Sequence, residues 1–135
     1  MIDRRETSDV EIEIRSDLNL AIIRPTGPFS IETARNWAGH LIVTPGFQRG
    51  MHQIFDLSDV NFAGVAPDEI SEAVGVVQRR NSKGTGLIAY VAPEDLHYGL
   101  ARMFTAAAEY HLPRVRGVFR SLKEATDWIV ATDQE

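Results

Sequence analysis

The sequence predicts an α/β fold, with a mixed, mainly parallel sheet of about five strands and helices packed on it. Two observations support this prediction. An amphipathic hairpin opens the chain, and apolar strands then alternate with amphipathic helices toward the C-terminus. A two-strand hairpin is antiparallel, whereas strands joined through helices pair in parallel. The predicted order β-β-α-β-α-β-α-β-α therefore requires both kinds of pairing.

The opening hairpin covers residues 9–24. The stretch "DVEIEIR" alternates, with Val10, Ile12 and Ile14 on one side and charged residues on the other. This period of two predicts a strand with one face in water. Turn-forming residues follow, and "LAIIR" returns as the second strand. Three further turn formers are predicted to end that strand: Pro25, Gly27 and Pro28.

The first helix is predicted from Ser30, which can cap it, to the break at Pro45 and Gly46. Its apolar stripe consists of Ile31, Ala34, Ala38, Leu41 and Ile42. Trp37 is expected in or near the core. Because it lies one step off this stripe, a position at a groove or a dimer surface is the alternative.

The remaining elements follow the same logic. "HQIFDL" is predicted as the third strand, "LIAYVA" as a central strand covered on both faces, and "VRGVF" as the last strand. Pro67 and Pro93 suit the first turns of the second and third helices. Ser121 and Glu124 form an S-x-x-E capping box, which predicts the start of a fourth helix. The buried face of that helix is expected to contain Leu122, Ala125, Trp128 and Ile129.

Composition limits the classes of function. The 135 residues predict one domain over 8–132, preceded by a flexible arm over 1–7. The absence of cysteine excludes disulfides, thiolate chemistry and cysteine-based metal sites. The net charge of −5 argues against a nucleic-acid partner. No apolar run approaches the roughly 18 residues of a transmembrane segment, and the polar N-terminus does not resemble a signal peptide, so we expect a cytoplasmic protein.

Ligands of parallel sheets bind beyond the carboxyl ends of the strands. The loop after the third strand carries Asp56, Ser58 and Asp59 at that end. These residues could form a phosphate-accepting serine, an acid pair for a metal ion, or a catalytic acid. Alternatively, Asp and Ser at a strand end bond nearby backbone N–H groups and shape a turn, which is the interpretation we favour.

The four histidines form no recognised metal or catalytic motif. His52 and Asp56 share a strand face, but four residues of strand separate them by about 13 Å, too far to share a metal ion. A hydrolase that uses Ser58, Asp56 and His97 is the weakest hypothesis, because no G-x-S-x-G elbow is present. We therefore predict no catalytic residue, no metal site and no cofactor.

A second group of polar residues lies at the predicted start of the third helix. Glu94, His97, Tyr98 and Arg102 fall near one another by i, i+3 and i+4 spacing. They form either a solvated face with ion pairs or a recognition face for a partner or a small anion.

The stretch "IFDLSDVNF" resembles the strand-to-loop region of STAS domains, the SpoIIAA-like anti-sigma-factor antagonists. The resemblance extends over residues 8–131 and includes "LIAYVAPEDLHYGLARMF" and "VFRSLKEATDWI". The second of these stretches is similar to the uncharacterised bacterial SpoIIAA-like group, whose fold is related to the CRAL-TRIO lipid-binding domains. The resemblance implies an α/β domain that works by binding.

In the antagonist family this loop continues into Asp-Ser-Ser/Thr-Gly, whose Ser or Thr is phosphorylated by a partner kinase. The matching residues here are Gly64, Val65, Ala66 and Pro67. The resemblance thus places Val65, which has no hydroxyl, at the acceptor position and Gly64 at the position of the acid. The phosphorylation switch should therefore not be carried over to this chain.

Taken together, these patterns predict a non-enzymatic regulatory or binding domain that recognises a protein or a small apolar or anionic ligand. The expected contact surface is the loop from Asp56 to Pro67 together with the start of the third helix. A homodimer through an open edge of the first strand is a further expectation. The alternative is a carrier of an apolar, lipid-like molecule, suggested by the CRAL-TRIO relationship together with Met103, Phe104 and the small residues 106–108.

Overall fold

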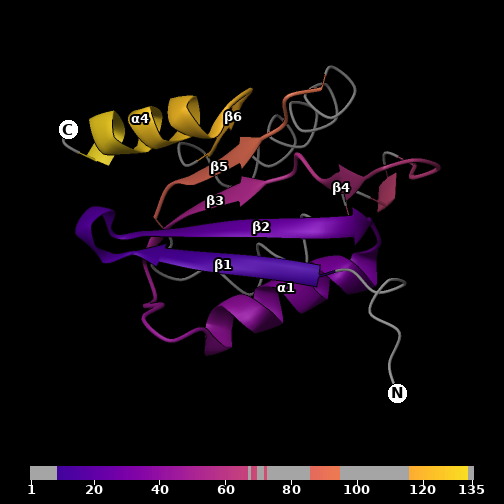
Figure 1. The fold of residues 1–135 in the computed structure, drawn as a ribbon, viewed down its shortest axis with the longest axis horizontal. Coiled ribbons are helices and arrows are strands. Elements are labelled where there is room, and N and C mark those ends of the chain that lie inside the picture. The colour runs from indigo at the N-terminus through magenta and orange to yellow at the C-terminus, as the bar shows by residue number, and fades with distance from the viewer. Residues whose placement is uncertain (1–8, 67, 70–71, 73–85, 95–115, 134–135) are drawn as a thin grey trace.

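The computed structural model describes residues 9–66, 68–69, 72, 86–94 and 116–133. The described strands are β1 (Asp9–Arg15), β2 (Leu20–Pro28), β3 (His52–Asp56), β4 (Val60–Asn61), β5 (Ile88–Val91) and β6 (Arg116–Phe119). The described helices are α1 (Ile31–Val43) and α4 (Leu122–Asp133), with a short 3-10 turn at Ser16–Leu18. The sheet order is β1-β2-β3-β5-β6, and β4 pairs with β2 (Figure 1). Only β1 is antiparallel to its neighbour among these pairs, so the predicted mixed, mainly parallel sheet is confirmed.

The hairpin is confirmed, but the predicted end of its second strand is wrong. β2 continues through Pro25 to Pro28 and stays paired with β1 as far as Thr26. On its other side β2 pairs with β3 up to Ile23 and with β4 from Gly27. Pro25 lies between the part of β2 that pairs with β3 and the part that pairs with β4. Neither parallel strand pairs with β2 at this position, so a proline, which has no backbone N–H to donate, is tolerated there.

Helix α1 begins with a reciprocal capping box, in which Ser30 Oγ accepts from the Thr33 N–H at 3.1 Å and Thr33 Oγ1 accepts from the Ser30 N–H at 2.9 Å. The predicted cap is therefore confirmed. One detail of the predicted stripe is wrong, because Ile42 is 51% exposed. Trp37 is buried in the core, which confirms its expected core position rather than the alternative at a groove or a dimer surface. Each residue turns the helix by about 100°, so Ile42 follows buried Leu41 onto the flank of α1.

The sheet separates two apolar cores. Alternate residues of β2 point to opposite faces, with Ala21 and Ile23 in the core under α1 and Leu20 and Ile22 in the core under α4. β5 also contributes to both cores, which confirms the prediction of a strand buried on both faces. In Figure 1, α1 lies beside β1 and β2 and α4 lies beside β5 and β6.

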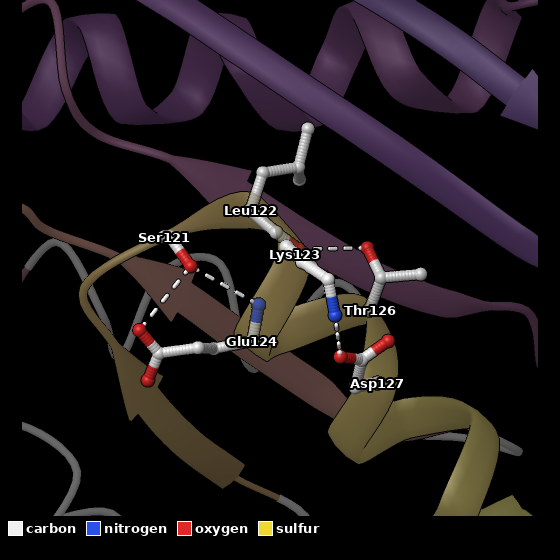
Figure 2. Close-up of polar contacts among 6 residues, drawn as sticks. All are labelled: Ser121, Leu122, Lys123, Glu124, Thr126 and Asp127. Atoms are coloured by element: carbon white, nitrogen blue, oxygen red, sulfur yellow. Dashed lines mark hydrogen bonds and ion pairs between the residues drawn. The ribbon is translucent and has the colours of Figure 1, made fainter.

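Helix α4 starts at the predicted S-x-x-E motif, in which Ser121 caps the helix (Figure 2). Ser121 Oγ accepts from the Glu124 N–H at 3.1 Å, and the Ser121 hydroxyl donates to Glu124 Oε1 at 3.2 Å. In the first two turns of α4, Lys123 Nζ and Asp127 Oδ2 form an exposed i, i+4 ion pair of 2.7 Å. The apolar face is as predicted, with two buried residues and two half-buried ones: Ala125, Ile129, Leu122 and Trp128.

Two predicted helices fall largely outside the described residues. Asp68, Glu69 and Glu72 have helical backbone, as expected for the second helix. The rest of that helix and the third helix after Glu94 lie outside the described ranges. Among the helices that are described, none is long and apolar enough to cross a membrane.

Candidate functional site

Three parallel strands end together at the carboxyl edge of the sheet. In register, Asp56 of β3 faces Val91 of β5, and Val91 faces Phe119 of β6. The pairing continues into the loops, because Leu57 N–H donates to Val91 O at 2.8 Å and Ala92 N–H donates to Phe119 O at 2.9 Å. The loops that the sequence places at one end of the sheet therefore begin side by side.

The Asp56 carboxylate closes a turn at the start of the candidate loop. Its Oδ1 accepts from the Ser58 N–H at 3.1 Å and also from the Ser58 hydroxyl. Both side chains are half-buried, whereas Asp59 is exposed. A carboxylate that accepts from the N–H two residues later forms an Asx turn, which fixes the direction of the chain. The turn-shaping interpretation of Asp56 and Ser58 thus describes their contacts in this structure.

A two-residue strand, β4, which no sequence pattern predicted, holds the middle of the loop against β2. Val60 and Asn61 pair with Gly27 and Pro28. Two backbone bonds flank this pair, from Gly27 N–H to Asp59 O at 3.3 Å and from Phe29 N–H to Asn61 O at 2.9 Å. A strand this short shows no detectable periodicity, so only the folded chain reveals the pairing.

A second turn and an aromatic anchor complete the loop. Asn61 Oδ1 accepts from the Ala63 N–H at 2.9 Å, and Gly64 adopts a positive φ of 75°. Phe62 is buried, with its ring centroid 5.0 Å from that of Phe29, and Phe29 lies 5.8 Å from Trp37. Trp37 of α1 therefore belongs, through Phe29, to the aromatic packing that anchors this loop.

Among the residues that the structure describes, the exposed charged side chains at this edge are mainly acidic. The exposed acids of the described residues here are Asp59, Asp68, Glu69, Glu72 and Glu94. Glu69 also supports the start of the second helix, since its N–H donates to Ala66 O at 3.1 Å. Acidic side chains in a first helical turn complement the positive end of the helix dipole, which explains part of this pattern without any ligand.

Arg120 contributes a contact at this edge that no sequence pattern predicted. It follows β6, and its Nη1 donates to the Pro93 carbonyl after β5 at 3.2 Å. The guanidinium thus links two loops and brings a cation to the acidic edge. The available signal was its position directly after the last predicted strand, "VRGVF".

The structure does not describe every predicted site residue. Gly64 is exposed and Val65 half-buried in the loop before the second helix, and Glu94 is exposed after β5. The other residues of the predicted recognition face, hydrolase and carrier site lie outside the described ranges: His97, Tyr98, Arg102, Met103, Phe104 and residues 106–108. These hypotheses therefore remain predictions.

His52 lies at the other end of β3 from Asp56 and the candidate loop. The residue is 6% exposed, and its Nδ1 accepts from the Leu87 N–H at 2.9 Å, which places the imidazole proton on Nε2. Nε2 lies 3.1 Å from Asp133 Oδ1, but the two groups are not aligned for a hydrogen bond. In the described part of the chain, no group of three or more potential ligands is arranged to hold a metal ion.

Comparison with known proteins identifies the fold. No protein-family model matches the chain, and no curated protein matches it in sequence. Among solved structures, an uncharacterised protein with a SpoIIAA-like fold from Shewanella loihica superposes with a TM-score of 0.61 at 15% identity, covering 96% of this chain and 98% of that one. An anti-sigma factor antagonist from Mycobacterium paratuberculosis superposes with a TM-score of 0.57 at 13% identity, covering 92% and 95% of the two chains. The chain therefore has a SpoIIAA-like fold.

Proposed function

We propose that this SpoIIAA-like chain is a non-enzymatic regulatory domain that binds a protein partner through the loop from Asp56 to Ala66. The observation that carries the proposal is that this loop combines a fixed backbone with an exposed surface. The Asp56 and Asn61 turns, the β4 pairing and the Phe62 anchor hold the backbone. A loop that is ordered before binding loses little conformational entropy when a partner docks.

The chemistry of the loop favours a partner with a basic surface. Asp59, Asn61, Ala63 and Gly64 are exposed, and the acidic side chains of Asp68 and Glu94 lie on the same edge. Opposite charges steer association and select partners more than they increase affinity. The name of the Mycobacterium structure, an anti-sigma factor antagonist, gives one example of this fold in a protein whose role depends on another protein.

The proposed mechanism does not use a phosphorylated loop. The position that resembles the acceptor of the antagonists is Val65, which has no hydroxyl. The nearest hydroxyl in the loop is that of Ser58, which donates to Asp56 and is half-buried. Binding would therefore be regulated by the amount or the state of the partner, and mass spectrometry of the protein from its native cells should find Ser58 unmodified.

Site-specific photocrosslinking in the native cells tests the surface. A photoreactive amino acid at Ala63 should give a discrete adduct with one protein, whereas the same residue at Thr126 on α4 should not. The purified partner should then bind more weakly to Asp59→Arg than to the control Asp127→Arg, whose position lies on an exposed face of α4. Equal adducts from both positions, or equal affinities of both variants, would contradict the proposal.

Activity assays test the catalytic alternative directly. The protein should not turn over libraries of esters or phosphoesters in a way that depends on Ser58. A rate that is lost in Ser58→Ala but retained in a variant of an exposed serine, such as Ser16→Ala, would show that the domain is an enzyme.

A further inference from the structure

A second surface, separate from the candidate loop, is the outer edge of β1. β1 is a terminal strand of the sheet, and within the described residues its seven residues pair with β2 on one side only. An edge strand presents a row of backbone N–H and C=O groups that another extended segment can bind.

The orientation of these backbone groups follows from two contacts at Asp9. The Asp9 carbonyl accepts from Thr26 Oγ1 of β2 at 3.5 Å, so it points toward β2. The next N–H, that of Val10, is bound by the Asp9 carboxylate at 3.1 Å rather than by the register partner across the ladder. Because these directions alternate along an antiparallel strand, the outward-pointing groups belong to Val10, Ile12 and Ile14.

The two faces beside this edge differ in chemistry. Val10, Ile12 and Ile14 are half-buried and pack against the core under α1. The turn after α1 continues this apolar side, since a Cβ built on Gly46 would lie 3.5 Å from Ile14 Cγ2. On the other face the side chains are exposed and acidic: Asp9, Glu11 and Glu13.

That acidic face lies away from the described helices. α4 packs mainly on β3, β5 and β6, at the far side of the sheet from β1. Two cations lie near the acids, and each is already paired: Arg24 with Glu13 at 3.1 Å and Arg15 with Asp17 at 2.9 Å. Asp9 and Glu11 therefore keep the strand edge negatively charged.

We propose that the β1 edge binds an extended peptide segment of a partner protein as an additional antiparallel strand, in which basic and apolar residues alternate. A peptide residue opposite Ile12 exchanges both backbone hydrogen bonds with it and places an apolar side chain on the α1 face. Its two neighbours then lie opposite Glu11 and Glu13, where Lys or Arg forms opposite-charge cross-strand pairs.

The same geometry argues against a second copy of this chain as the occupant. If two β1 strands paired about Ile12, Glu11 of one copy would lie opposite Glu13 of the other on the exposed face. Like charges directly opposite each other destabilise a strand pair. The inference concerns a different surface from the loop of the proposed function, so it can fail or succeed independently.

The test uses the full chain and a fluorescent peptide of the length of β1, in which Lys alternates with Val. We expect saturable binding by fluorescence anisotropy that weakens as salt is added. A peptide with Glu in place of Lys should not bind. Glu11→Lys should weaken binding about fivefold to tenfold, whereas the control Asp127→Lys should leave it unchanged.

Backbone methylation separates strand addition from simple charge attraction. In the proposed antiparallel pairing, the N–H groups of the Val residues face β1, so methylating those nitrogens should abolish binding. Methylating the Lys nitrogens, which point away, should preserve it. Equal effects of the two methylated peptides would overturn the proposal, and so would a free protein that sediments as a dimer.

Discussion

Gly86, just before β5, provides the most demanding test of the packing described above. A Cβ built on Gly86 would lie 2.6 Å from His52 Nδ1, 2.8 Å from Gly50 O and 2.9 Å from His52 N. Two of these three atoms belong to the backbone and cannot move aside as a side chain could. Gly86→Ala must therefore displace the start of β5 from β3 and also push the His52 ring away.

Two costs combine in this variant. Overpacking of a dense site costs about 1–3 kcal/mol. Displacement of the ring also breaks the bond from Leu87 N–H to His52 Nδ1, and a buried polar group without a partner costs about 1–3 kcal/mol more. We therefore expect the free energy of unfolding to fall by about 2–6 kcal/mol in total.

Urea denaturation followed by circular dichroism measures this loss. The free energy of unfolding of a small protein falls by about 1–3 kcal/mol per M of urea. The urea concentration at the unfolding midpoint should therefore be lower by about 1 M or more in Gly86→Ala. Gly39→Ala is the matched control, because the residue is inside α1 and, apart from its chain neighbours and the nearby backbone of the helix itself, no atom lies within 4 Å of its built Cβ. Alanine favours a helix over glycine, so this variant should gain about 0.5–1 kcal/mol. A Gly86→Ala midpoint equal to that of the unmodified protein would refute the reasoning.

Three further predictions concern local contacts. Asp56→Ala removes the acceptor of the Asx turn and should cost about 1–2 kcal/mol in a thermal melt, whereas Asp56→Asn should keep most of it; an equal loss in both would contradict the turn. Ser121→Ala should cost about 1 kcal/mol in urea denaturation, and Ser121→Asp, which restores a cap, should recover it. The Arg15 guanidinium lowers the pKa of Asp17 through a hydrogen bond, so their pair stabilises the fold above the ordinary aspartate range and loses that effect as pH falls through the lowered pKa. An NMR titration of Asp17 should show this lowered midpoint, and Arg15→Gln should return it to the ordinary range.

Sequence patterns predicted those parts of the fold that depend on local chemistry. The alternation of Val10, Ile12 and Ile14 predicted β1, and the caps at Ser30 and Ser121 predicted the starts of α1 and α4. Each of these signals arises within a few residues, either from side-chain direction or from a side chain that bonds a nearby backbone group. The parallel order of the later strands followed from their alternation with helices.

Tertiary contacts decided what local patterns could not. The continuation of β2 through Pro25 depends on where β3 stops and β4 begins, and neither strand is near Pro25 in sequence. The sequence left Trp37 either in the core or at a surface groove, and the structure decides for the core, where Trp37 packs against Phe29 and Phe29 packs against Phe62 of the candidate loop.

The candidate site shows the same division. The sequence by itself determined that Asp56, Ser58 and Asp59 follow a buried strand at the carboxyl edge of the sheet. Only the tertiary structure decided that Asp56 closes a turn, that β4 holds the loop to β2 and that Arg120 joins the same edge. The physical reason is that hydrogen bonds and ring contacts between distant segments depend on three-dimensional register, which no local pattern encodes.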